Sequence, residues 1–104
     1  MNYRSLQAIK KDLASGKITC HSLVADYIER IEKEKHLNAF LEVWGDEALA
    51  KAKTIDEKIK QGKAGKLAGM VMGIKDNLCY KGHKVSASSK ILEGFESLYT
   101  ATVV

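Results

Sequence analysis

The sequence contains no proline, only two cysteines and no long uninterrupted apolar run. Cys20 and Cys79 stand far apart with no C-x-x-C spacing, which argues against a disulfide framework and against a structural zinc site. No segment reaches the roughly 18 apolar residues that a membrane span needs, and the N-terminus leads into no signal region. We therefore expect a soluble cytoplasmic protein with two free thiols and no membrane contact. The absence of proline points to no class.

Motifs for bound cofactors are also missing. Neither G-x-G-x-x-G nor G-x-x-x-x-G-K-[ST] occurs, which removes the usual dinucleotide and phosphate-loop interpretations. The three histidines show no ligand spacing with carboxylates or with each other, so we expect no metal site in this chain. They are His21, His36 and His83.

The charge is mildly positive, with 17 Lys+Arg against 13 Asp+Glu over 104 residues and a formal net charge of +4. The excess lies in the second half, much of it in a glycine-bearing connector that carries Lys58, Lys60, Lys63 and Lys66. No aromatic residue interleaves with these lysines, so stacking on nucleic-acid bases is not supported. The pattern favours a solvated linker over a nucleic-acid site.

Hydrophobic periodicity and capping residues predict a helical pair over 5–36 and a third helix over 46–60. Ser5 and Thr19 suit the N-caps of the first two helices, and Gly16 suits the end of the first. Asp46 is the expected cap of the third helix, which closes before Gly62.

Short apolar, β-branched or aromatic runs predict strands over 38–44 and 67–75, and a loop from 78 that leads to a terminal strand over 99–104. A short helix is expected from about Ser89 to Leu92. Glycines inside 67–75 suggest a close approach of another backbone or a ligand. This order predicts an α/β protein, with helices packed on a mixed β-sheet that these residues leave incomplete. A β-branched run at Val104 suggests an element cut in the middle, with strand edges prone to association.

Lys75 is the first candidate for chemistry, because it follows the most apolar stretch of the chain. Desolvation at such a position favours the neutral amine, which can act as a base. By position alone, a lysine at a strand end is much more often a solvated or ion-paired residue than a base, and Asp76 and Asn77 suit a turn. A nucleophilic pair of Cys79 and His83 lacks a third orienting group.

Three serines lie close to Lys90, namely Ser86, Ser88 and Ser89. The S-x-x-K spacing of serine-lysine acyl transferases is nevertheless absent, because Ala87 occupies the needed position. Turn and capping roles suit these serines better.

At Gly69–Asn77, the sequence Gly-Met-Val-Met-Gly-Ile-Lys-Asp-Asn resembles the lysine segment of the amidase signature family. The resemblance continues through 84–93 and 99–104, and upstream through 16–31 and 37–40, so five blocks match in order. Within the family, Asn38-Ala39-Phe40 and the block over 87–92 are most similar to the A subunits of tRNA-dependent amidotransferases. The chain then corresponds to the N-terminal portion of a single amidase domain.

The resemblance implies a serine amidase that uses a nucleophilic serine, a bridging cis-serine and a lysine. Lys75 would be the general base that takes a proton relayed from the nucleophile, while backbone amides hold the oxyanion. The implied substrate is glutamine, whose ammonia passes to a B subunit that amidates glutamyl- or aspartyl-tRNA with ATP and Mg. The implied partners are therefore the B and C subunits, with aminoacyl-tRNA involved indirectly and no cofactor in this chain.

Two departures from the family pattern stand out. Val71 occupies a position where the family often has proline, and the segment with both catalytic serines lies downstream of everything present. Ser88-Ser89 lacks the flanking glycines of that segment, so we expect no amidase activity from these 104 residues alone. The alternatives are an amidase of a small free amide without tRNA subunits, and a non-catalytic interaction module or gene fragment with an exposed Lys75.

Overall fold

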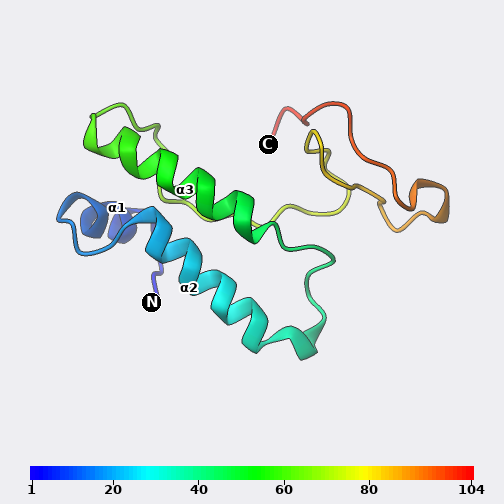
Figure 1. The fold of residues 1–104 in the computed structure, drawn as a ribbon, viewed down its shortest axis with the longest axis horizontal. Coiled ribbons are helices and arrows are strands. Elements are labelled where there is room, and N and C mark those ends of the chain that lie inside the picture. Colours follow the sequence, from blue (N-terminus) through cyan, green and yellow to red (C-terminus); the bar gives the residue numbers. More distant parts are fainter. The chain divides into compact units, whose positions relative to one another are not determined.

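The computed structural model describes all of residues 1–104 as two compact units, Met1–Val71 and Met72–Val104. All three α-helices belong to the first unit (Figure 1). The helical elements are α1 Leu6–Ala14, α2 Cys20–Lys33, the 3₁₀ turn η1 Lys35–Leu37, α3 Gly45–Lys60 and the 3₁₀ turn η2 Lys90–Leu92. None of the helices has the length and apolar character needed to cross a bilayer. The predicted helices, including the short one near Ser89, are confirmed within one or two residues.

Helix α1 begins and ends at the residues that the sequence predicts. The Ser5 hydroxyl accepts the backbone N–H of Ala8 at 3.2 Å, which satisfies one of the free donors of the first turn. After the last turn, Gly16 adopts φ 76°, a left-handed conformation that glycine takes at little cost.

Helix α2 starts with a reciprocal capping arrangement. The Thr19 hydroxyl accepts the N–H of Ser22 at 3.0 Å, and the Ser22 hydroxyl accepts the N–H of Thr19 at 3.0 Å. The prediction that Thr19 is the N-cap is confirmed. Two further donors of this turn, the N–H groups of Cys20 and His21, are bound by the Asp56 carboxylate from α3.

The predicted cap of α3 is wrong. Asp46 lies inside the first turn, and the capping position belongs to Trp44, whose side chain makes no capping hydrogen bond. The carboxylates of Asp46 and Glu47 instead place negative charge at the positive end of the helix dipole. The helix closes at Gln61, and Gly62 follows with φ 68°, as the sequence predicts.

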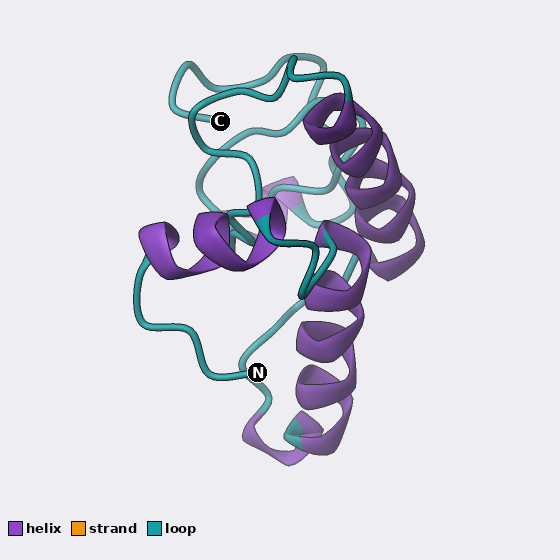
Figure 2. Cartoon of the chain, turned by 90° about the vertical axis from the view of Figure 1, so that its left-hand side faces the viewer, coloured by secondary structure: helices purple, strands orange, loops and turns teal.

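The core of the first unit lies between the helices. Helices α2 and α3 pack side by side, and α1 lies near the start of α2 (Figures 1 and 2). One buried cluster joins α1 to the start of α2 and consists of Ile9, Ile18 and Leu23. A second joins α2 to α3 and consists of Cys20, Val24 and Ala52, flanked by half-buried Leu49, Ile55 and Ile59. These are the apolar faces that helical spacing predicts.

Gly69 packs against helix α1. Its φ is +91°, and a Cβ at this position would lie 2.6 Å from Leu13 Cδ1 and 3.0 Å from Ile9 Cγ2. The glycine therefore does mark a close approach, but the approaching atoms belong to side chains of α1 rather than to a backbone or a ligand.

The predicted strands over 38–44, 67–75 and 99–104 are not formed in this structure. Figure 2 shows helices and loops only, and the three segments are loop and turn. A strand is stabilised by a neighbour in a ladder, and an apolar run without that partner has no reason to stay extended. Asn38 even adopts φ 50°, and Leu41 is 78% exposed. The mixed sheet predicted from the sequence is therefore absent from these 104 residues.

The second unit contains one short antiparallel contact. Lys84 and Glu96 form an isolated β-bridge, and Val85 N–H donates to Phe95 O at 3.1 Å. Val85 and Ser97 are the buried side chains of this unit. A loop-rich segment is what the sequence predicts for residues 78–98.

Candidate catalytic lysine segment

Lys75 lies in the second unit at the start of a tight turn. Its carbonyl oxygen accepts the N–H of Leu78 at 2.9 Å, and its side chain is exposed and forms no ion pair. The expected burial of Lys75 is therefore not present. Ile74 next to it is half-buried, whereas the lysine side chain itself is exposed. Exposure is what the non-catalytic alternative predicts for this residue.

Asp76 is the centre of a hydrogen-bond network directly after the lysine. Its Oδ1 accepts the N–H of Ser86 at 3.0 Å and its Oδ2 accepts the Ser86 hydroxyl at 2.5 Å. Its carbonyl oxygen accepts the N–H of Ala87 at 2.9 Å. Hydrogen bonds from the Ser86 side chain and backbone hold the pKa of Asp76 below its usual value, because they favour the ionised carboxylate. Asp76 therefore does more than the expected turn role, because its carboxylate also binds a residue ten positions further along the chain.

The segment that Asp76 binds has an unusual backbone. Ala87 and Ser88 are consecutive residues with φ 48° and 59°. Residues other than glycine rarely adopt this left-handed backbone conformation. Ser89 N–H donates to Ser86 O at 2.8 Å and closes the turn. The prediction of turn duty is confirmed for Ser86.

Cys79 lies in a different cluster of the same unit, with Ser97 and Tyr99. Hydrogen bonds from the Tyr99 and Ser97 side chains lower the pKa of the Cys79 thiol, because they stabilise the thiolate. The imidazole of His83 has other neighbours. Its ring packs 4.2 Å from the ring of Tyr80, centroid to centroid, and its Nδ1 lies 3.0 Å from Lys81 O.

Cys20 is buried at the start of α2. Burial and the neighbouring Asp56 carboxylate raise the pKa of its thiol to about 11, since both disfavour the thiolate. Both thiols are free, as expected. The described residues contain no group of three or more His, Cys, Asp or Glu side chains placed to share a metal ion.

The lysine-bearing connector behaves as a solvated linker. Residues 61–66 are exposed loop and turn, and the Lys60 ammonium lies 3.4 Å from the Glu57 carboxylate of its own helix. The exposed loop carries Lys63 and Lys66 as the linker interpretation predicts, whereas Lys58 and Lys60 lie in the last turn of α3.

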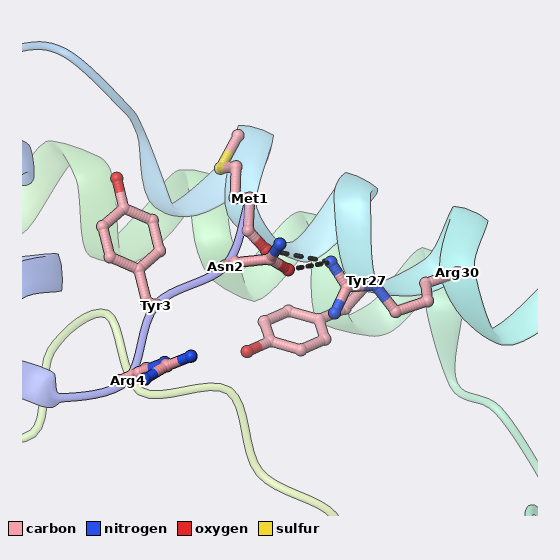
Figure 3. A pocket seen from close by; sticks show the side chains of 6 residues that line it. All are labelled: Met1, Asn2, Tyr3, Arg4, Tyr27 and Arg30. Carbon is pink, nitrogen blue, oxygen red and sulfur yellow. Dashed lines mark hydrogen bonds between the residues drawn. The ribbon is translucent and has the colours of Figure 1, made fainter.

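The first unit also carries an open hollow of about 300 Å³ (Figure 3). Its lining comes from the N-terminal segment and α2, namely Met1, Asn2, Tyr3, Arg4, Tyr27 and Arg30. The Arg30 guanidinium donates to Met1 O at 2.9 Å and to Asn2 Oδ1 at 3.3 Å (Figure 3). It also lies 3.5 Å from the Asp26 carboxylate. No serine, threonine or cysteine lines the hollow, so it carries no nucleophile of the kind that amidases use for acyl transfer.

Three contributors to these arrangements are absent from the sequence prediction. Asp56 caps a helix 36 residues away, and Ser97 and Tyr99 adjust a thiol that is distant in sequence. No local pattern signals any of them. For the Asp76 and Ser86 pair, the sequence gives one local indication, which is that Asp76 is a polar turn residue directly after an apolar run.

Known proteins resemble the whole chain. It is 42% identical over 105 residues to the A subunit of glutamyl-tRNA(Gln) amidotransferase from Chlorobaculum tepidum, covering 100% of this chain and 22% of that protein. Proteins of the same name from Pelodictyon phaeoclathratiforme and Salinibacter ruber are 43% and 39% identical over the whole chain, which covers 22% and 20% of them. The chain thus spans about a fifth of the length of these curated relatives. No solved structure matches.

The amidase family profile matches residues 22–104. This range includes Lys75, the Asp76 network and the serine turn. Since the match covers most of the chain and agrees with the motif resemblance, the chain belongs to the amidase family.

Proposed function

We propose that this chain is the N-terminal part of an amidotransferase subunit that hydrolyses glutamine, with Lys75 as its general base. The observation that carries the proposal is the 42% identity, over the full chain, to a protein named as the A subunit of glutamyl-tRNA(Gln) amidotransferase. The Lys75-Asp76-Asn77 segment supports it, because the motif at that position is typical of the catalytic lysine of amidases.

The proposed reaction requires the side-chain amine of Lys75 to be neutral. A nucleophilic serine attacks the side-chain amide of glutamine, and its proton passes through a bridging serine to the lysine nitrogen. Both serines belong to the part of the parent enzyme outside these residues. Backbone N–H groups would stabilise the oxyanion of the tetrahedral intermediate. The products are glutamate and ammonia, and the ammonia serves a B subunit that activates the aminoacyl-tRNA with ATP and Mg.

The intact enzyme must supply what the described residues lack. Lys75 is exposed here, and a charged amine cannot accept the proton, so the remaining four-fifths of the enzyme would have to desolvate it. In that setting the apolar segments 38–44, 67–75 and 99–104 would join a mixed sheet, because neighbouring strands would then be present. The partners in this proposal are the B and C subunits.

The test uses the full-length enzyme in its complex and compares Lys75→Ala with Lys81→Ala, an exposed lysine of the same unit. We expect Lys75→Ala to lower glutamine hydrolysis by about 10²-fold or more, whereas Lys81→Ala leaves it within about twofold. Adding free ammonia should restore amidation of the tRNA in Lys75→Ala, because ammonia bypasses the hydrolytic step.

Two results contradict the proposal. Full glutamine hydrolysis by Lys75→Ala would exclude a role as base. Equal loss of glutamine-dependent and ammonia-dependent amidation would make the lysine structural. An enzyme that hydrolyses small free amides but never forms amidated tRNA would instead favour the rival amidase function.

A further inference from the structure

The Asp76 carboxylate is bound to a distant segment and not to the lysine beside it in sequence. Both of its oxygens accept hydrogen bonds from Ser86, one from the backbone and one from the hydroxyl, while Lys75 forms no ion pair. A carboxylate turned toward the ammonium would favour the charged lysine and oppose its use as a base. Both oxygens of Asp76 are instead bound by donors of another segment.

The Asp76 main chain is tied to the same segment as its side chain. The carbonyl oxygen of Asp76 accepts from Ala87 N–H at 2.9 Å, and the carbonyl oxygen of Lys75 accepts from Leu78 N–H at 2.9 Å. The backbone that follows the Lys75 Cα is therefore fixed twice, by a tight turn and by the 86–88 segment across from it.

The segment to which Asp76 is hydrogen-bonded has a strained backbone. Ala87 and Ser88 both have positive φ, and such residues persist only where their surroundings hold them. Asp76 accepts three hydrogen bonds from this segment, two from Ser86 and one from Ala87 N–H. The strained turn at 87–88 is thus joined by hydrogen bonds to the residue that follows the candidate base, which is where positional precision matters in catalysis.

We propose that Asp76 is a positioning residue, which holds the Lys75 backbone in place through Ser86 and the left-handed turn at 87–88. The inference rests on the proposed function of Lys75 and deepens it. Asp76 touches no reacting atom in this scheme. It acts through the lysine, so its loss should affect the rate of the chemical step more than the binding of glutamine.

The experiment measures glutamine hydrolysis by the full-length enzyme in its complex. Asp76→Asn and Ser86→Ala each remove part of the pair, and Glu93→Gln, an exposed acid in the same unit, is the matched control. We expect the first two to lower kcat by about 10- to 100-fold with KM within about twofold, and the control to change neither. The kcat of the double variant should fall little below that of either single variant, because both substitutions disrupt the same contact between Asp76 and Ser86.

Ala87→Gly provides the rescue. Glycine adopts positive φ freely, so the turn at 87–88 needs fewer hydrogen bonds to stabilise it. We therefore expect Ala87→Gly to raise kcat several-fold in the Asp76→Asn background. Ammonia-dependent amidation reports folding in every variant. If Asp76→Asn fails to fold by that measure, Ser86→Ala and its rescue decide the question alone.

Wild-type kcat in a folded Asp76→Asn, fully additive effects, or no rescue by glycine would each overturn the positioning role. Lys75→Ala run in parallel separates the two proposals. If Lys75→Ala hydrolyses glutamine normally, the proposed function fails. If it is inactive while Asp76→Asn is normal, only the present inference fails.

Discussion

The carboxylate of Asp56, on α3, accepts the backbone N–H of Cys20, at the start of α2, at 2.7 Å, across 36 residues of sequence. Its second oxygen accepts the N–H of His21 at 3.0 Å. One helix therefore supplies the N-terminal cap of another, in addition to the local Thr19 and Ser22 pair. The start of α2 and the packing of α3 are consequently coupled.

Asp56→Ala should destabilise the helical unit by about 1–2 kcal/mol, because two donors at a half-buried helix end lose their acceptor. Glu57→Gln, an exposed neighbour on the same helix, is the control and should change stability by less than about 0.5 kcal/mol. Urea unfolding followed by helical circular dichroism measures both. Faster amide exchange at Cys20 and His21 should accompany the loss. An unchanged unfolding midpoint would show that water replaces the carboxylate without cost.

Gly69→Ala should cost about 2–3 kcal/mol, since the new Cβ would lie 2.6 Å from Leu13 Cδ1 at a backbone φ of +91°. Gly73→Ala is the matched control, because nothing lies within 4 Å of its Cβ position and its φ is not positive. The same unfolding experiment measures both. Adding Leu13→Ala in the Gly69→Ala background should remove the clash and leave the backbone cost. Equal effects at the two glycines would contradict the contact.

The two thiols should react with iodoacetamide at very different rates. The pKa of Cys20 is raised to about 11 by burial, so only about one thiol in a thousand is ionised at pH 8, and the pKa of Cys79 is lowered by Tyr99 and Ser97. Cys79 should therefore label at least about 100-fold faster at pH 8. Peptide mass spectrometry across pH 6–9 measures the rates. Tyr99→Phe should slow Cys79 at pH 7, and identical rates before and after this change would contradict the assigned cause.

The chain by itself should associate in solution at micromolar concentration. Many large apolar side chains are exposed, including Leu41, Ile91, Leu98 and Val103. Exposed apolar surface favours contact with other molecules. Sedimentation velocity should detect oligomers, and replacing Leu41 and Leu98 by lysine should reduce them. A concentration-independent monomer would contradict this expectation. The cause differs from the strand edges expected from the sequence, because the structure has no strands.

The helices could be predicted because their signals are local. Ser5 and Thr19 cap the turns that follow them, and the apolar face of α3 repeats within the helix itself. The strands could not, since an apolar run such as 38–44 is compatible with a strand but forms one only beside a partner. Long-range capping by Asp56 is unpredictable for a related reason, as it depends on how two helices pack.

The candidate site could also be predicted only in part. Lys75 could be singled out from its motif and from the apolar run before it, but its solvent exposure could not, because exposure depends on which other segments cover the side chain. The contact of Asp76 with Ser86 joins two loop positions ten residues apart, next to a left-handed turn at 87–88. A pair of non-glycine residues with positive φ carries no sequence signature.

The self-contained packing of the first unit has a consequence for synthesis. Its helix caps, both core clusters and the Gly69 contact use only residues within Met1–Val71. Ribosomes add about 5–20 residues per second, so this unit can form as soon as residue 71 leaves the exit tunnel. The lysine segment then emerges behind a folded unit. Limited proteolysis of ribosome-bound chains of increasing length should show protection of the helices beginning at that point.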